Sequence, residues 1–416
     1  MCFRTIKWSM SLSAVLLVMT GKVWAGDQPA AGRDFGYSSS VSSGSGFGSA
    51  GSEGAPQSSS MAEESCAQAA ALMTQGVKLA DGSAAEEDLY RRALEICPAM
   101  AEVHYNLGVV LFKRNNAEEA LRSFERAVQL KDDPIFRSAL GSVKLSLGRV
   151  EEARQEFESL LKAQPQNVKA LQGLSLALEK SGQWAEALEM LRRARALEAN
   201  DFITQFNLGV MYERVGQLDS AIESYQKATQ IDAGHYDAWY YLGLAYEKAG
   251  RYLEGQAAMR RAVELKRGSL EAENALARLY GRSEDWEKAE LALRRAVAMN
   301  DRDAATLINL AIVLLKKKQP ALAGEMAVKA LNLEPKNVRA LGVTGWAELE
   351  LGNYAQAEKH FLAALELDAG YAAVHQALGV LYQRQGRKEE AQVHYDAAFK
   401  LDPSLEAQKK IDWRFW

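Results

Sequence analysis

Five histidines are the residues of this 416-residue sequence best suited to proton transfer or to metal binding. They are His104, His235, His360, His375 and His394. No two of them have the spacing of a zinc-protease helix, and the sequence contains neither a phosphate-binding glycine loop nor a nucleophile elbow. We therefore expect a chain that is not an enzyme, with no cofactor, no metal and no small-molecule substrate.

Three cysteines could bind a metal ion or form a disulfide. Cys2 lies in a segment that we expect to be removed, which leaves Cys66 and Cys97. Two thiolates without a nearby histidine supply too few ligands for a zinc site. A disulfide between them requires an oxidising compartment, so their chemistry depends on where the chain is delivered.

The N-terminus has the pattern of a secretory signal peptide. Arg4 and Lys7 give it a positive start, and residues 10–20 are apolar but too few to span a bilayer comfortably. We expect a signal peptide over residues 1–25 and an exported, periplasmic protein of the bacterial cell envelope. The alternative is an uncleaved anchor over residues 8–24, the one case in which we expect membrane contact.

The charge and composition that follow the leader narrow the choice of partners. Cleavage removes three basic and no acidic residues, which lowers the formal net charge from −4 to −7. An acidic chain of this kind is not expected to bind nucleic acid. Residues 26–61 are rich in Gly and Ser, so we expect a disordered linker. The composition leaves open whether it is a plain spacer or a tether.

From Ala101 to Leu405 the sequence repeats about every 34 residues, in nine units of which the first is one residue short. Counting Ala101 as position one, positions eight and twenty are small, as in Gly209 and Ala221, which lets two helices approach closely. Position fifteen is usually glycine, the residue that favours a left-handed helix cap. Glu284 and Lys318 replace that glycine, so we expect less regular turns there.

One unit carries most of a known signature. Trp239, Leu242, Gly243 and Tyr246 match the pattern W-x2-L-G-x2-Y, and the chain thereby resembles the tetratricopeptide-repeat (TPR) family. The resemblance implies an all-α fold, namely a right-handed α-solenoid (superhelix) of about ten TPR helix-turn-helix repeats. The first of these is an irregular N-terminal TPR-like repeat over residues 62–100, followed by nine TPR repeats over residues 101–405.

Within that scheme Cys66 begins the first helix of the irregular repeat and Cys97 ends its second helix. In a helix hairpin these two points lie at the same end, so we expect a Cys66–Cys97 disulfide, with two buried free thiols as the alternative. Closing a loop of about 30 residues would stabilise the fold by about 3–4 kcal/mol on the chain-entropy estimate.

Residues 406–416 form the expected C-terminal capping segment, which ends with three aromatic side chains. Trp413, Phe415 and Trp416 either cover the exposed end of the last repeat or anchor a partner.

The TPR resemblance also implies where a partner binds. It places positions two, five, six, nine and twelve of each unit on a concave groove. The candidate partner-binding residues at these positions are aromatic, amide or aliphatic: Tyr105, Asn106, Phe112, Phe206, Asn207, Tyr240, Tyr241, Ile308, Asn309 and Trp346. Asparagines at position six resemble the asparagine ladder of O-linked N-acetylglucosamine transferases. An asparagine side chain can pair with both the donor and the acceptor of an extended peptide backbone. The alternative is that these residues are ordinary surface asparagines and packing aromatics.

The function predicted from the sequence is a non-catalytic protein–protein interaction scaffold of the cell envelope that binds a protein or peptide segment. Two alternatives remain open: a self-assembling structural solenoid, and an accessory subunit of an envelope complex for polysaccharide export, pilus assembly or secretion.

Overall fold

The computed structural model describes residues 57–405, and all statements on structure concern that range. It contains twenty α-helices and one short 3-10 helix, and residues 57–405 contain no strand. The chain divides into two compact units between Val215 and Gly216. The predicted signal peptide, most of the predicted linker and the predicted capping segment lie outside the described residues.

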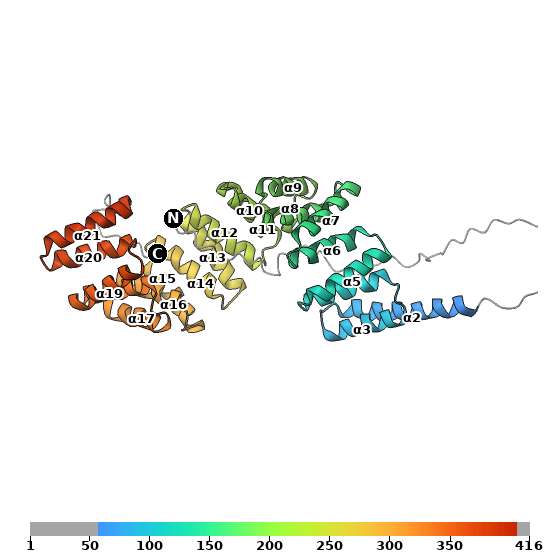
Figure 1. Cartoon of the computed structure of the whole chain (residues 1–416), viewed down its shortest axis with the longest axis horizontal. Helices are drawn as coiled ribbons and strands as arrows, with labels where there is room; N and C mark the ends of the chain where they lie inside the picture. The colour runs from blue at the N-terminus through green and yellow to red at the C-terminus, as the bar shows by residue number, and fades with distance from the viewer. Residues whose placement is uncertain (1–56, 406–416) are drawn as a thin grey trace, which may run out of the picture. The chain divides into compact units, whose positions relative to one another are not determined.

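The first unit consists of short helices joined by tight turns (Figure 1). They are α2 (Gln57–Leu79), α3 (Ala84–Ile96), α4 (Ala101–Lys113), α5 (Ala117–Leu130), α6 (Pro134–Ser146), α7 (Val150–Ala163), α8 (Val168–Lys180), α9 (Trp184–Leu197) and α10 (Phe202–Arg214). Helix α2 begins at Gln57, five residues before the expected start of the first repeat at residue 62. The helix starts earlier because no glycine or proline interrupts the chain between Pro56 and Gly76.

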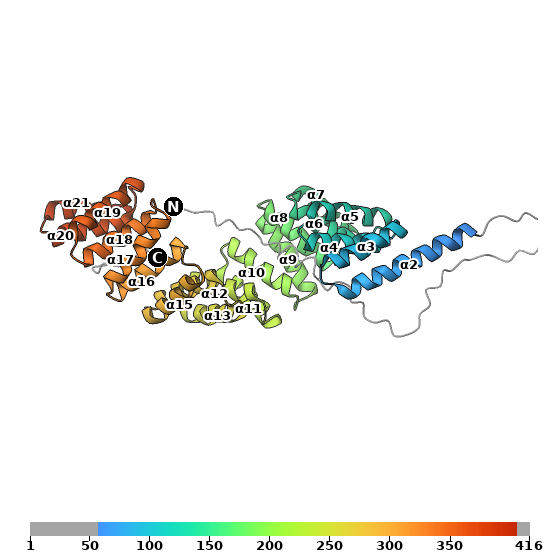
Figure 2. The ribbon, with the colours of Figure 1, turned by 90° about the horizontal axis from the view of Figure 1, so that it is seen from below.

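The second unit continues the same pattern, as its labelled helices show in both views (Figures 1 and 2). Its helices are α11 (Leu218–Ile231), α12 (Tyr236–Lys248), α13 (Tyr252–Leu265), α14 (Leu270–Arg282), α15 (Trp286–Met299), α16 (Ala304–Lys316), α17 (Pro320–Leu333), α18 (Val338–Glu350), α19 (Tyr354–Leu367), α20 (Ala372–Arg384) and α21 (Lys388–Leu401), followed by η1 (Pro403–Leu405). In both units we call the even-numbered helices A helices and the odd-numbered ones B helices. The A-face is the side of the A helices formed by positions two, five, six, nine and twelve.

Each A helix packs closely on the B helix that follows because the contact positions are small. A Cβ atom added to Gly141 would lie 2.7 Å from the Phe157 ring, and one added to Gly345 would lie 2.8 Å from the Phe361 ring. Such distances are too short for any side chain larger than hydrogen. The 34-residue recurrence of small residues therefore reflects the close approach of paired helices in both units.

The turns between A and B helices are more uniform than the sequence predicts. Gly250 has a left-handed φ of 72°, and Glu284 and Lys318 adopt the same region with a φ of 59° each. The hydrogen bonds also match: Arg251 N donates to Tyr246 O at 2.9 Å, and Asp285 N donates to Tyr280 O at 2.9 Å. The expectation of irregular turns at Glu284 and Lys318 is wrong, because these residues accept a left-handed backbone that costs a non-glycine residue about 1–2 kcal/mol.

The hydrophobic core of the second unit is continuous from Met259 to Ala391, with each repeat contributing to the layer of the next. This is the packing expected when a single hairpin cannot bury both of its helices. Within the described part of the chain, no helix combines the length and the apolar character needed to cross a bilayer.

Candidate functional site

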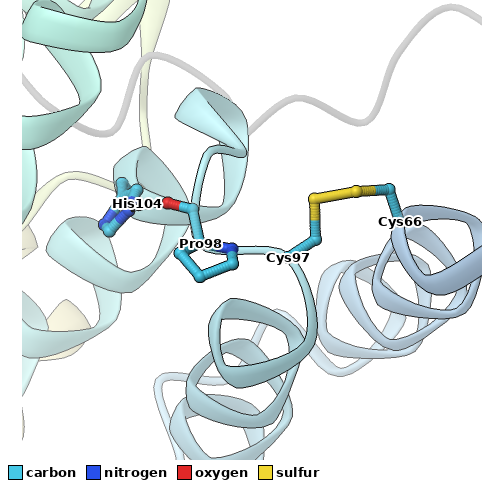
Figure 3. The surroundings of a disulfide bond; sticks show 4 residues. All are labelled: Cys66, Cys97, Pro98 and His104. Carbon is cyan, nitrogen blue, oxygen red and sulfur yellow. Dashed lines mark hydrogen bonds between the residues drawn. A yellow bond between two sulfur atoms is a disulfide. The ribbon is translucent and has the colours of Figure 1, made fainter. Parts of the chain in front are cut away.

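The irregular first repeat brings the two remaining cysteines together. Cys66 lies on α2 and Cys97 caps α3, with their sulfur atoms 2.12 Å apart and their Cα atoms 5.1 Å apart (Figure 3). The pair spans 31 residues of sequence. This geometry is what the predicted disulfide requires. Formation of the bond in the mature protein remains a proposal and is taken up below.

Next to the cysteine pair, a histidine fixes the loop that leads into α4. His104 Nε2 lies 2.9 Å from the carbonyl oxygen of Pro98, which follows Cys97 directly (Figure 3). His104 occupies repeat position four, and in three other repeats the position-four side chain bonds a carbonyl six residues earlier. These contacts are Gln205 Nε2 to Ala199 O at 2.8 Å, Trp239 Nε1 to Ala233 O at 3.0 Å, and His375 Nε2 to Ala369 O at 3.2 Å.

This recurring contact explains why polar N–H donors occupy a position that the sequence alone indicates as a packing position. The donor bonds a loop carbonyl that no helix satisfies, and so in these four repeats it holds the B-to-A loop against the next A helix. His104 and His375 therefore have a structural role in the described fold. Their spacing of six residues from the accepting carbonyl could have indicated this contact in the sequence.

The A-face of the first unit contains a small, shallow hollow, which we call hollow 1. Its lining comes from α4, α6 and the first turn of α8: Tyr105, Val109, Ile135, Ser138, Ala139, Ser142 and Lys169. All seven residues occupy positions two, five, six or nine of their repeats. Small side chains form the floor, aromatic and branched side chains form the wall, and a lysine stands at the rim.

The wall of hollow 1 is held rigidly by stacked rings. Tyr105 lies 4.9 Å from the Phe136 ring in a stacked arrangement and 5.8 Å from the Phe124 ring. Burial raises the pKa of the Tyr105 hydroxyl, which stays neutral at physiological pH. Ile135 is 45% exposed, so a large apolar side chain remains open to solvent beside the hollow. Tyr105 and Ile135 thus give this part of the A-face an apolar surface.

A second, smaller hollow, hollow 2, lies among α8, α9 and α10 in the same unit. It is lined by Ser175, Leu176, Glu179, Leu191, Asn207, Val210 and Met211. Desolvation raises the pKa of the Glu179 carboxyl although Arg214 and Lys180 act to lower it. Asn207, predicted at position six, therefore lines a small hollow together with a carboxylate that no sequence motif marks.

On the A-face of the second unit, aromatic side chains and an ion pair lie together. Tyr236 and Tyr240 stack at 5.7 Å, and Tyr241 meets Tyr240 edge-on at the same distance. Arg278 of α14 donates two hydrogen bonds of 2.7 Å to the Glu247 carboxylate of α12. These bonds raise the pKa of Arg278 further above its usual value, so the guanidinium stays charged.

Farther along the second unit, amides connect three successive A helices. Asn274 Nδ2 donates to Thr306 Oγ1 at 2.7 Å, and Asn309 Nδ2 donates to Asn274 Oδ1 at 3.4 Å. Arg339 donates to Asn309 Oδ1 at 3.2 Å. The predicted asparagine at position six thus bonds to its neighbours. Its partners Asn274 and Arg339 were missed because they occupy positions five and two, where no asparagine recurrence marks them.

Three predicted groove residues are corrected by their burial. Phe112 is 2% exposed, Ile308 1% and Trp346 2%, so none of them can contact a partner. Each fills a contact with neighbouring helices instead; the Trp346 ring, for instance, meets the Phe361 ring at 6.4 Å. Large apolar side chains at these positions gain more by entering the helix contacts than by facing solvent.

The other predicted groove residues are half-buried, so each retains some surface: Tyr105, Asn106, Phe206, Asn207, Tyr240, Tyr241 and Asn309. The structure brings Tyr105 to hollow 1 and Asn207 to hollow 2, and it joins Tyr240 and Tyr241. Phe206 stacks on Phe202 at 5.9 Å. Asn106 enters neither hollow.

Comparison with protein families identifies the class of this chain. Models described as "Tetratricopeptide repeat" match residues 101–134, 144–205, 236–268, 274–331, 325–372 and 372–405, and one described as "TPR repeat" matches residues 215–250. The chain belongs to the TPR family. TPR repeats are in general non-catalytic, and they act as protein–protein interaction scaffolds. The repeats of this chain support a role as a protein–protein interaction scaffold.

Similarity to individual proteins is partial. A protein O-mannosyl-transferase of Caenorhabditis elegans is 30% identical over 91 residues, which cover 22% of this chain and 13% of that protein. The crystal structure of MamA from Desulfovibrio magneticus is 22% identical, with 41% of this chain and 96% of that chain covered and a TM-score of 0.39. PilF of Pseudomonas aeruginosa is 16% identical, with 50% and 94% covered and a TM-score of 0.43.

Proposed function

We propose that this chain binds an extended protein or peptide segment along its A-face, as an envelope protein exported to the bacterial periplasm. The observation that carries the proposal is hollow 1, whose seven lining residues all come from the positions that the TPR pattern turns toward a ligand. An apolar wall with a small-residue floor supplies contact area, and the half-exposed Ile135 extends it.

Site-specific photo-crosslinking in living cells tests where partners bind. A photo-reactive phenylalanine analogue replaces Ile135 on the A-face or, as a matched control in the same repeat, the exposed Gln155 on the outer side of α7. The proposal predicts discrete adducts from position 135 and few from position 155. Equal labelling at both positions would contradict it, and adducts formed only between copies of this chain would favour a self-assembling solenoid.

The compartment and the disulfide form one linked part of the proposal. Export makes a Cys66–Cys97 bond possible, because the periplasm is oxidising and the cytoplasm is not. Intact-mass measurement of the native protein should give a chain that starts at Gly26. Its mass should be about two mass units below that of its reduced form, because forming the disulfide removes two hydrogens. A full-length chain in which Cys66 and Cys97 are both free thiols would overturn the export proposal.

A further inference from the structure

We propose that His375 and His394 bind a divalent transition-metal ion, such as Zn²⁺ or Ni²⁺, which crosslinks the last hairpin that the structure describes. Such a site goes beyond the proposed function and does not depend on it, and it is contrary to the sequence-based expectation of no metal. His375 lies on α20 and His394 on α21, the two helices of that hairpin (Figure 1). Sequence spacing does not indicate the pair, because 19 residues separate the two histidines.

The separation of the two Nδ1 atoms suits one shared metal ion. Imidazole nitrogens bind zinc at about 2.0–2.1 Å, so two of them at right-angled to tetrahedral positions lie about 2.9–3.4 Å from each other. The Nδ1 atoms of His375 and His394 are 3.0 Å apart, which falls inside that range. The two rings are inclined by 33°, and a small rotation about their broad χ2 torsions would direct both nitrogens to one ion.

A backbone carbonyl prepares His375 to be a ligand. Its Nε2 atom lies 3.2 Å from the carbonyl oxygen of Ala369, and a carbonyl can only accept, so the proton is on Nε2. In the neutral ring, Nδ1 then carries a lone pair on the side of His394. Metal-binding histidines usually donate their second N–H to such an oxygen, which fixes the tautomer and the orientation of the ring. The proton between the two Nδ1 atoms belongs to His394, and it moves to Nε2 of that ring when the ion binds.

The surroundings of the pair leave the site open to water. Glu358 and Glu390 both act electrostatically on His394, but each also pairs with Arg387, so neither is counted as a ligand. Among residues 57–405, no group of three histidine, cysteine, aspartate or glutamate residues is arranged to hold a metal. Two protein ligands leave the other coordination positions to water. We therefore expect an ion that exchanges readily, in contrast to a closed structural zinc site.

Two other repeats show that the loop contact does not explain the pair. His104 makes the same contact from position four, but position twenty-three of its repeat is Ser123. His360 occupies position twenty-three of another repeat, where position four is Leu341. The contact with the loop carbonyl therefore does not require a histidine at position twenty-three, and it leaves His394 without an explanation that the metal site supplies.

A crosslink is useful at this place in the repeat array. A hairpin in such an array is stabilised by the hairpins that stack on it. No described α-helix follows α21, so α20 and α21 have one described neighbour hairpin. The same holds for α2 and α3, and their hairpin contains the cysteine pair. Each end of the described array thus has a pair of side chains that can join its two helices.

Calorimetric titration of the full, untagged chain with NiCl₂ and with ZnCl₂ tests the site. His375→Gln is the most informative variant, because Gln205 shows that a glutamine at position four can make the loop contact. Loss of an outer-shell partner already costs about 10- to 100-fold in metal affinity, so His375→Gln and His394→Gln should each weaken binding at least about tenfold. His104→Gln and His360→Gln are the matched controls and should bind as tightly as the unmodified chain.

Hydrogen exchange of α20 and α21 gives a second measurement. At a metal concentration about ten times the dissociation constant, opening of these helices should become about tenfold rarer, because the ion binds the closed hairpin and not the open one. Exchange in α4 and α5 should not change. The inference would be overturned if the unmodified chain bound neither ion, if His375→Gln and His394→Gln bound as tightly as the controls, or if exchange in α20 and α21 stayed the same.

Discussion

The two units use the same repeat positions in different ways. In the first unit, A-face residues line hollow 1, and Lys169 makes no ion pair with another described residue. In the second unit, residues at the same positions bond to one another, as in the Glu247–Arg278 pair and the contacts of Asn309. The repeat position thus determines the side of the helix on which a side chain lies. Contacts with neighbouring repeats then determine whether that side chain is accessible to a partner or stabilises the fold.

The largest expected effect concerns the first unit alone. Replacing both Cys66 and Cys97 with Ser should lower the stability of α2 and α3 by about 3–4 kcal/mol, because the open chain gains conformational freedom when unfolded. Hydrogen exchange should show faster opening of these two helices, with α12 to α21 unchanged. Unchanged exchange in α2 and α3 would show that the bond does not form in the native protein.

The contact between A and B helices is shared by the two units, so it should respond equally in both. Gly141→Val and Gly345→Val should each cost about 1–3 kcal/mol, because the new side chain meets a buried phenylalanine ring. Denaturant unfolding of the two variants measures this cost. A much larger loss in one unit would show that the repeats of the two units are not packed alike.

Alanine substitution of a charged A-face residue should change the stability of the two units by clearly different amounts. Arg278→Ala should destabilise the second unit by about 1.5–3 kcal/mol, because Glu247 loses both hydrogen bonds while it remains largely buried. Lys169→Ala should leave the first unit unchanged or slightly more stable, since that lysine opposes the helix dipole. Thermal unfolding of both variants tests this difference in destabilisation, and equal destabilisation by the two substitutions would contradict it.

The smallest effect is a pH dependence at the end of the second unit. Burial, together with the neighbouring His375, lowers the pKa of His394, and the Nδ1 atoms of these two histidines lie 3.0 Å apart. Glu358 and Glu390 act in the opposite direction. A lowered pKa means that the folded state binds fewer protons than the unfolded state, so this contribution is present above a pH of about 6.5 and is lost as the pH falls below that value.

Hydrogen exchange of α20 and α21 at about pH 5 and about pH 8, corrected for intrinsic rates, measures that dependence. His394→Gln should reduce it. Burial also lowers the pKa of His360 on α19, so a remaining pH effect in the variant should map to α19. A pH-independent opening of α20 and α21 in the unmodified chain would contradict the prediction.

The sequence alone predicts the helix pairs, because small residues such as Gly141 must recur wherever two backbones meet. It does not predict that Phe112 and Trp346 are buried in the core, because the repeat position alone does not show where the neighbouring residues leave space for a large side chain. It also misses Arg278, whose role depends on a contact between repeats. Glu284 misled the turn prediction because its left-handed backbone is tolerated at moderate cost.

The central claim is that partners meet the A-face and not the outer side of the helix pairs. Photo-crosslinking at Ile135 and Gln155, carried out in the same cells and quantified as adduct per molecule, tests it most directly because the two sites belong to one hairpin. We expect partner adducts that depend on position 135 and disappear at position 155. Adducts that form mainly from position 155 would place the partner on the opposite side and contradict the account.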